Sequence, residues 1–213
     1  AIAPALKSEA LLMDVGSTKS DIVAAALNTL GKKLGCFVPV HPIAGKEVAG
    51  VEHSDADLYK DRALIVTPME SSGATQIQLA KQVWKSLGSY ITELTPAAHD
   101  AAFAAVSHLP HVLSYAIIRG IFQQHNGPDL IALGGPGFRD FSRIAASDPV
   151  VWRDILTTNR DQVLLQISHF KDALNDFEKA IQDNEPQALE DMIRQASDLR
   201  FNWRMGANSK STE

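Results

Sequence analysis

Residues 11–18 of this chain read Leu-Leu-Met-Asp-Val-Gly-Ser-Thr, and this stretch decides the fold. Its apolar first half predicts a buried strand, and its Gly-Ser-Thr end predicts the turn into a helix that ends near Leu30. Ser17 or Thr18 is the expected N-cap of this helix, with Asp21 in its first turn. A strand followed directly by a helix is the repeating unit of an α/β sheet.

The alternation of strands and helices continues along the chain. The pattern predicts strands at 36–40 and 63–67, a helix at 74–87 and a strand at 90–94. Such alternation indicates a parallel or mixed sheet. Four strands make about half of a doubly wound, Rossmann-like nucleotide-binding domain. We therefore expect residues 1–95 to be the C-terminal part of such a domain.

Helical periodicity takes over at Pro96. Residues 97–124 are apolar nearly all round, which predicts a central buried helix that Pro110 kinks or splits in two. A second helix carries apolar residues spaced alternately by four and three, an a/d seam suited to a packed helix hairpin or a dimer contact. The seam consists of Val163, Ile167, Phe170, Leu174, Phe177 and Ile181. After a break at 184–186 a last amphipathic helix follows, so we expect 96–213 to form an all-α domain.

Composition and charge reduce the number of protein classes and partners that fit this chain. The 213 residues are 45% hydrophobic and 21% charged, which is ordinary for a soluble globular protein. The formal net charge of −5 argues against a nucleic-acid partner. A single cysteine, Cys36, excludes an internal disulfide framework and suits the cytoplasm. His108, His111 and Arg119 interrupt the most apolar stretch, 101–122, so a buried helix is favoured there over a membrane span.

Several residues that can carry chemistry follow the predicted strands. His41 lies where a strand ends, at the sheet edge where α/β proteins bind ligands, and histidine is a plausible general base near neutral pH. A histidine that only bonds loop backbone is the alternative. Ser17 follows another strand and either caps a helix or serves the same site. Lys19 and Lys46 add positive charge near this rim or are plain surface, and Glu47 either orients a basic partner or only caps the chain locally.

His108 and His111 lie three residues apart, on one helical face across Pro110. This spacing is compatible with a metal, but no second cluster with metal-ligand spacing accompanies it, so no metal site is expected. Two hydrogen-bonded core histidines are the structural alternative. Polar side chains beside a proline-interrupted helix favour a binding role.

A glycine-rich loop at 134–137 precedes another predicted helix. It lacks the Lys-Ser/Thr ending of a phosphate-binding P-loop. The helix carries Asp140 and Arg143 one turn apart, within reach of an ion pair. A partly buried arginine aimed by an aspartate is a bidentate receptor for a carboxylate. Asp148 is then the expected N-cap of a further helix, with Pro149 at its first position.

Three strings in this sequence resemble, in order and spacing, the signature of the prephenate and arogenate dehydrogenases of tyrosine biosynthesis. They are His-Pro-Ile-Ala-Gly at 41–45, Ser-His-Leu-Pro-His at 107–111, and Gly-Gly-Pro-Gly-Phe-Arg-Asp-Phe-Ser-Arg at 134–143. The match runs from about Asp14 to about Asp161. The Gly-x-Gly-x-x-Gly motif that begins this family does not occur in the chain. We therefore expect that the N-terminal part of the nucleotide-binding domain is lacking.

The resemblance implies an oxidoreductase that uses NAD or NADP. Its substrate is prephenate, oxidatively decarboxylated to 4-hydroxyphenylpyruvate, or arogenate, converted to tyrosine. It also implies a cytoplasmic homodimer that assembles through the helical domain, with neither a nucleic acid nor a membrane as partner.

The resemblance also assigns roles to individual residues. His41 matches the catalytic histidine that hydrogen-bonds the ring hydroxyl of the substrate. Ser17 matches the serine that orients this histidine and the nicotinamide, with Gly16 beside the cofactor. The residues that match positions binding, gating or lining the substrate site are Lys46, Glu47, His108, His111, Asp140, Arg143 and Trp152, with Arg143 as the carboxylate receptor.

Two other functions compete with this interpretation. Another two-domain dehydrogenase, acting on a 3-hydroxy acid, is expected to use a lysine base on the central helix, but residues 97–124 contain no lysine. A non-catalytic helical dimerisation module leaves the polar trio His41, His111 and Arg143 unexplained.

Overall fold

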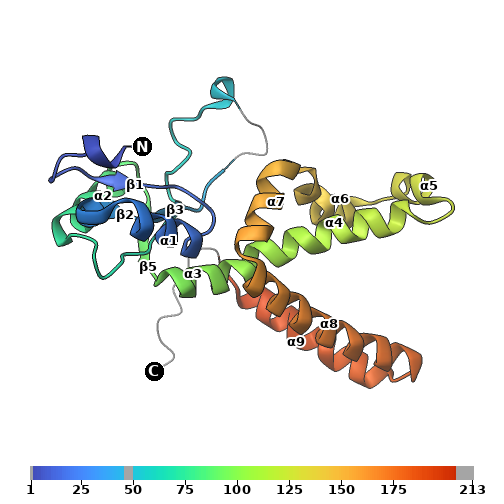
Figure 1. Ribbon diagram of the computed structural model, residues 1–213. Coiled ribbons are helices and arrows are strands. Elements are labelled where there is room, and N and C mark those ends of the chain that lie inside the picture. The colour runs from blue at the N-terminus through green and yellow to red at the C-terminus, as the bar shows by residue number, and fades with distance from the viewer. Residues whose placement is uncertain (1, 46–49, 205–213) are drawn as a thin grey trace. The chain divides into compact units, whose positions relative to one another are not determined.

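The computed structural model describes residues 2–45 and 50–204 (Figure 1). The chain divides into two compact units, Ala1–Val163 and Leu164–Glu213. The first unit holds every strand of the described residues and all the candidate site residues that they include. The expected division of the chain at residues 95 and 96 stays a prediction.

Five short strands form two sheets in the first unit. β1 (Leu12–Met13) pairs in parallel with β2 (Phe37–Val38). The other sheet has the order β3-β4-β5, from β3 (Val40–Pro42), β4 (Ala63–Val66) and β5 (Tyr90–Glu93). In it β3 is antiparallel to β4, and β4 is parallel to β5. The sequence predicted a parallel or mixed sheet, and the β3-β4-β5 sheet is mixed.

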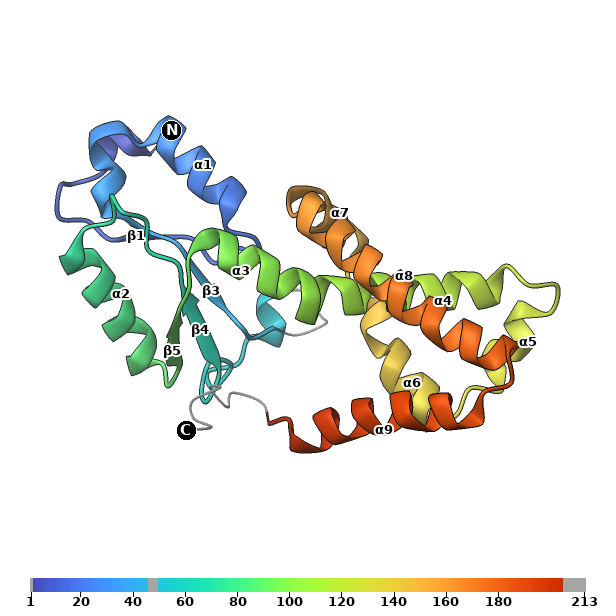
Figure 2. The same ribbon diagram turned by 90° about the horizontal axis from the view of Figure 1, so that it is seen from below.

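Two helices cover opposite faces of these strands (Figure 2). Successive side chains of a strand point to opposite faces. Phe37 packs with Ala26 of α1 (Ser20–Thr29), while the next residue, Val38, packs with Ala80 and Trp84 of α2 (Ala74–Ser86). Helices on both faces of the strands are the hallmark of a doubly wound fold, so the predicted Rossmann-like class is confirmed.

The predicted N-cap of α1 is wrong. The structural N-cap is Lys19, and neither Ser17 nor Thr18 caps the helix. The cap comes instead from Asp100, whose carboxylate accepts hydrogen bonds of 2.8 Å from the backbone N–H groups of both Lys19 and Ser20. A carboxylate is a strong partner for a helix N-terminus, and it replaces the local hydroxyl that the sequence pattern suggested.

Seven α-helices account for most of the described residues from Pro96 onwards. They are α3 (Pro96–Phe103), α4 (Leu109–Phe122), α5 (Gly127–Ala132), α6 (Pro136–Ser142), α7 (Pro149–Thr158), α8 (Arg160–Gln182) and α9 (Pro186–Asn202). Prolines begin several of them, because the first helical position needs no N–H donor. Asp148 caps α7 as predicted, accepting from the N–H groups of Val150 at 2.8 Å and Val151 at 2.9 Å. The predicted all-α class of this half is confirmed.

The central apolar helix was predicted to be buried all round, and the structure differs in its local geometry and in its exposure to solvent. A π-helical turn, Ala104–His108, joins α3 to α4, and the Leu109 N–H bonds the Ala104 carbonyl. The wider turn places Pro110, which has no N–H, just inside the start of α4. The helix is not buried all round within this chain, since Val106 is 72% and Phe122 is 63% exposed.

Pro96–Phe122 is long and apolar enough to cross a membrane by length and composition. Its polar side chains point to a different role. His99 and His108 are buried inside the first unit, at 0% and 1% exposure. We therefore regard this helix as part of a soluble protein's core, with its apolar outer face uncovered in the single chain.

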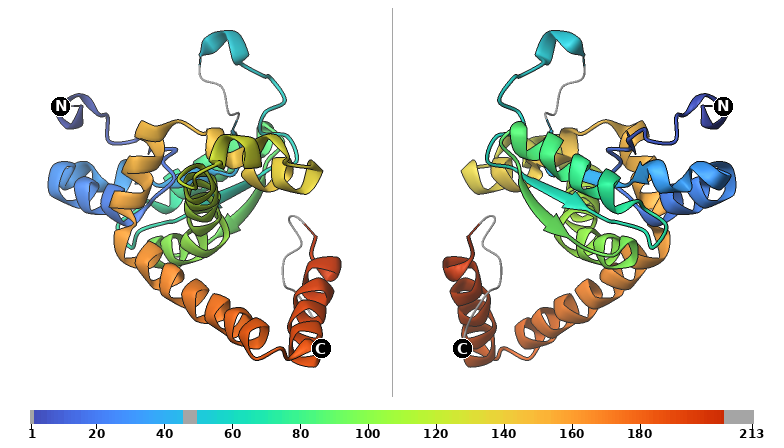
Figure 3. Two further views of the ribbon diagram at one scale, coloured as in Figure 1. Left: turned by 90° about the vertical axis from the view of Figure 1, so that its right-hand side faces the viewer. Right: turned by 90° about the vertical axis from the view of Figure 1, so that its left-hand side faces the viewer.

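The second unit consists of the greater part of α8 followed by α9. The predicted break is present, with Asn184 in the left-handed region at φ 52°. The two helices meet at this turn and diverge away from it (Figure 3). The predicted seam is only partly covered within one chain: Val163 is buried, whereas Leu174 and Ile181 are 51% and 64% exposed.

Candidate active site

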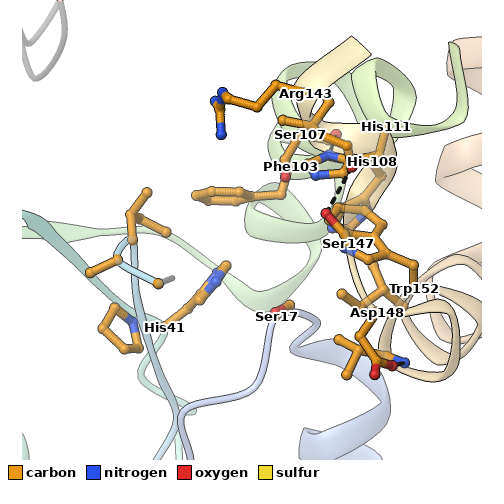
Figure 4. A pocket seen from close by; sticks show the side chains of 17 residues that line it. Ser17, His41, Phe103, Ser107, His108, His111, Arg143, Ser147, Asp148 and Trp152 are labelled. Atoms are coloured by element: carbon orange, nitrogen blue, oxygen red, sulfur yellow. Dashed lines mark hydrogen bonds between the residues drawn. The ribbon is translucent and has the colours of Figure 1, made fainter. Parts of the chain in front are cut away.

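A cavity of about 700 Å³ lies in the first unit, between the strands and the helical half (Figure 4). Its wall on the strand side carries Ser17 and His41. Its helical wall carries residues from the π-helical turn, α4 and α7. The lining residues with polar or aromatic side chains are Ser17, His41, Phe103, Ser107, His108, His111, Arg143, Ser147, Asp148 and Trp152.

His41 is the middle residue of β3, opposite Ile65 of β4. Its ring packs against Phe103, with centroids 4.9 Å apart. Burial is the main cause that lowers the pKa of His41 to about 3, and the neighbouring basic side chains of His99, Lys19 and His108 act in the same direction. The imidazole is therefore neutral near pH 7 and able to accept a proton from a bound molecule.

Gly16 and Ser17 form the tight turn between β1 and α1. The Gly16 N–H donates to Asp14 Oδ2 at 2.9 Å, and a Cβ at Gly16 would lie 2.5 Å from Ile22 Cδ1. Only glycine fits this turn without a shift of Ile22. Ser17 lines both the main cavity and an adjacent hollow of about 510 Å³. The turn thus places Ser17 between the main cavity and the adjacent hollow, where it can contact a group bound in either.

Lys19 occupies a different place from the one that the sequence suggested. Its side chain is 0% exposed. Its Nζ forms an ion pair with Asp14 and donates to the Val40 carbonyl at 2.7 Å. Burial lowers the pKa of Lys19, and the charge of Asp14 acts in the opposite direction. Lys19 thus supports the backbone next to His41 and does not form part of the cavity rim.

His108 is held by Asn159, at the end of α7. The Asn159 side-chain amide donates to His108 Nδ1 at 3.1 Å and to the Asp100 carbonyl at 2.8 Å. A ring nitrogen that accepts a hydrogen bond carries no proton, so neutral His108 carries its proton on Nε2. Burial is the main cause that lowers the pKa of His108 to about 4.

His111 stacks on Trp152 of α7, with ring centroids 3.5 Å and planes 18° apart. Its Nδ1–H donates to the Ser107 carbonyl at 2.9 Å, which leaves Nε2 for a ligand. Burial lowers the pKa of His111, although the bond to Ser107 acts in the opposite direction. In residues 2–45 and 50–204, no group of three or more His, Cys, Asp or Glu side chains is arranged to hold a metal.

Arg143 begins the short 3₁₀ turn Arg143–Ala146 after α6 and lines the cavity. It is exposed in this chain, not partly buried as expected. The described residues that line the cavity do not include Asp140. Asp140 forms an ion pair with its neighbour Arg139, at 3.0 Å, and the two side chains are 71% and 75% exposed. Lys46 and Glu47, also expected here, lie outside the described residues.

Sequence reasoning missed His99, Asp100 and Phe103 of α3. His99 and Asp100 are 0% and 4% exposed, and His99 Nε2 lies 2.8 Å from His41 Nδ1. One signal was present in the sequence. Two adjacent ionisable residues interrupt an alanine-rich apolar helix, and such residues are rarely buried unless they are paired.

Comparison with known protein families now identifies the chain. Residues 1–93 match the family model described as prephenate dehydrogenase, nucleotide-binding domain. Residues 95–195 match the model described as prephenate dehydrogenase, dimerization domain. The chain belongs to the prephenate dehydrogenase family. The resemblance seen in the sequence is confirmed.

Individual members of the prephenate dehydrogenase family support this assignment. Cyclohexadienyl dehydrogenase of Zymomonas mobilis is 30% identical over 203 residues, covering 94% of this chain and 69% of the relative. Prephenate dehydrogenase of Bacillus subtilis is 29% identical, and the match covers 92% of this chain and 53% of that enzyme.

Solved structures of family members share the fold. Prephenate dehydrogenase of Aquifex aeolicus, in complex with hydroxyphenyl propionate and NAD+, superposes with a TM-score of 0.88 at 34% identity. That match covers 94% of this chain and 69% of the other. Arogenate dehydrogenase of Synechocystis superposes with a TM-score of 0.80 at 27% identity, covering 95% of this chain and 73% of the other.

Proposed function

We propose that this protein catalyses the NAD(P)-dependent oxidative decarboxylation of prephenate or arogenate in tyrosine biosynthesis. The observation that carries the proposal is a cavity that combines His41 and Ser17 on the strand side with His108, His111 and Arg143 on the helical side. These groups suit a hydroxylated ring with carboxylate substituents. The relatives named as prephenate, cyclohexadienyl and arogenate dehydrogenases support the same substrate class.

The turn at Gly16 and Ser17 fits the nicotinamide end of the cofactor. Ser17 lines the cavity and the neighbouring hollow, so a group bound in that hollow reaches the side of the cavity where His41 lies. The close approach of Ile22 to Gly16 keeps the turn tight. When bound, NAD(P) supplies the hydride acceptor for the carbinol carbon of the substrate.

His41 is the general base in this proposal. Its neutral ring takes the proton of the substrate hydroxyl, while loss of CO₂ makes the ring aromatic. Ser17 orients both the hydroxyl group of the substrate and the nicotinamide end of the cofactor. The imidazole of His108, which carries its proton on Nε2, acts as a hydrogen-bond donor to the substrate.

Arg143 and His111 bind the anionic groups. A guanidinium presents a planar fork of donors that matches a carboxylate, and Arg143 lines the helical side of the cavity. The stack on Trp152 holds the ring of His111 in one plane. Trp152 also forms part of the apolar wall against which the substrate ring would lie.

We also propose that the enzyme is a soluble, cytoplasmic homodimer. Val106 and Phe122 on the central helix and Leu174 and Ile181 on α8 are apolar and more than half exposed in the single chain. Uncovered apolar surface of this extent marks protein–protein contact. The match of residues 95–195 to a dimerization domain supports a second copy as the partner.

The test is an assay of the full-length protein with prephenate and with arogenate, each with NAD+ and with NADP+. We expect reduction of the nicotinamide together with formation of 4-hydroxyphenylpyruvate or tyrosine. Folded protein that reduces neither cofactor with either substrate would contradict the proposal. Turnover of a 3-hydroxy acid in place of both would support the competing dehydrogenase class.

A further inference from the structure

A chain of three ionisable side chains runs from the cavity into the interior. His41 Nδ1 lies 2.8 Å from Nε2 of His99, and His99 Nδ1 lies 2.9 Å from Oδ1 of Asp100. We call these three residues the His–His–Asp relay. Only His41 lines the cavity, while His99 and Asp100 are buried behind it.

The carboxylate of Asp100 fixes the direction of every hydrogen bond in the relay. It already accepts from the backbone N–H groups of Lys19 and Ser20, both at 2.8 Å. Burial alone would raise the pKa of Asp100, but the hydrogen bonds from His99, Ser20 and Lys19 lower it to about 2. Asp100 is therefore ionised at neutral pH and can only accept.

Each later bond follows from the one before it. Because Asp100 can only accept, His99 Nδ1 carries a proton and donates it. In the form of His99 with a single ring proton, Nε2 is bare and accepts from a proton on His41 Nδ1. Neutral His41 is left with its lone pair on Nε2. This tautomer is the one that a general base needs when its Nδ1 is bonded to the protein interior.

Packing holds the two imidazoles in this arrangement. Phe103 stacks on His99, with centroids 4.5 Å and planes 26° apart, and also lies against His41. The same Asp100 carboxylate caps α1, so the anchor of the relay is also tied to the helix that follows Ser17. Rotation of either imidazole would break a buried hydrogen bond, which is costly.

We propose that His99 and Asp100 are positioning residues that hold His41 in the tautomer with a free Nε2. The Asp100 carboxylate also stabilises the positive charge that His41 gains when it takes a proton. This role rests on the proposed function of His41 as the base. A wrong tautomer at a general base removes most of its contribution, about 10²–10⁴-fold in rate.

The first experiment reads the tautomers directly, without substrate or cofactor. The full-length protein is labelled with ¹⁵N in its histidines, and spectra of His41→Asn and His99→Gln assign the two rings. We expect both His41 and His99 to carry the proton on Nδ1. In Asp100→Asn the side chain keeps one acceptor oxygen for three donors and loses its charge, so neither ring should remain wholly in this tautomer. A His41 that carries its proton on Nε2 in the unaltered protein would overturn the proposal.

The second experiment compares two substitutions of His99 by kinetics. The side-chain oxygen of His99→Gln still accepts from His41, whereas His99→Leu keeps an apolar volume and removes the acceptor. We expect kcat to fall by about 10²-fold or more in His99→Leu and by less than about 10-fold in His99→Gln, with little change in KM in either. Equal losses in the two variants would overturn the positioning role.

Asp129→Asn is the matched control for Asp100→Asn, because Asp129 is an exposed acid in the first turn of α5 and is not among the described residues that line the cavity or the adjacent hollow. It should leave both the tautomers and kcat unchanged. The two experiments also separate two kinds of failure. Absence of turnover with every cofactor and substrate would overturn the proposed function, while the spectra would still decide whether the relay exists.

Discussion

Lys19 forms an ion pair with Asp14, and the side chain of Lys19 has no exposure to solvent while that of Asp14 is 19% exposed. Lys19 Nζ also donates to the Val40 carbonyl, while Asp14 Oδ1 accepts from the Val40 N–H at 3.2 Å. The two members of the pair therefore hydrogen-bond both backbone polar groups of Val40, the residue before His41. Breaking a partly buried pair on the lysine side is destabilising, because the Asp14 carboxylate is left without its cationic partner.

Lys19→Met should lower the free energy of unfolding by up to about 3 kcal/mol, the lower end for a buried pair, because the Asp14 carboxylate loses its cationic partner but stays partly exposed. Chemical denaturation of the full-length protein measures the change. Lys85→Met is the control, since Lys85 is an exposed lysine near the end of α2. A loss no larger than that of the control would show that the pair contributes nothing to stability.

His41→Asn should lower kcat by about 10²-fold or more with a modest change in KM. Asparagine cannot accept a proton, so the general base is lost while most of the cavity remains. Steady-state kinetics near pH 7 checks this. Near-normal turnover would mean that His41 has a structural role only.

Arg143→Ala should raise the KM for the substrate by about 10- to 100-fold, because a hydrogen bond to a charged group contributes about 1.5–3 kcal/mol. Arg143→Lys should restore only part of the affinity, since a point charge does not reproduce the planar fork. Arg139→Ala is the control, because Arg139 is exposed, bonded to Asp140 and outside the described cavity lining. If Arg143→Ala leaves the KM for the substrate unchanged and weakens cofactor binding, Arg143 does not bind the substrate carboxylate as proposed.

The protein should be a dimer at micromolar concentration in sedimentation velocity. Val106→Glu and Phe122→Glu should favour the monomer, because each places a charge on the apolar outer face of the central helix. Leu87→Glu, on an exposed residue just after α2, is the control. A stable monomer for the unaltered protein would contradict the proposed assembly.

The free energy of unfolding should fall as the pH decreases from about 6.5 to about 4. His41 and His108 have pKa values lowered to about 3 and about 4, chiefly by burial, against 6.5 in an unfolded chain. In this window the unfolded state binds more protons than the folded state, so the stabilisation is complete above pH 6.5 and is lost towards acid. Each histidine should contribute about 1.4 kcal/mol per pH unit.

Denaturation curves at several pH values measure this slope. His108→Asn should reduce it by about one histidine's share, whereas replacement of the exposed His125 by asparagine should not. A free energy of unfolding that stays constant from pH 6.5 to pH 4 would contradict the lowered pKa values.

The sequence by itself determined the features that depend on neighbouring residues. Alternating apolar runs set the strands at Ala63–Val66 and Tyr90–Glu93. Prolines set the starts of α7 and α9, and Asp148 acts as the cap that its position predicted. The family signature brought His41, His108 and His111 to one cavity, as the order of the three strings implied. These features are local, or belong to a pattern carried by short segments.

Only the tertiary structure decided which charged groups are buried and what they bond. The sequence placed Lys19 at the rim of the site or on plain surface, yet it is buried, pairs with Asp14 and donates to the Val40 carbonyl of β3. Asp100 caps a helix that begins 80 residues earlier in the chain, and this contact displaced the local cap expected from Ser17 or Thr18. The physical reason is that a buried charge needs partners in three dimensions, and those partners come from segments whose distance along the chain leaves no pattern in the sequence.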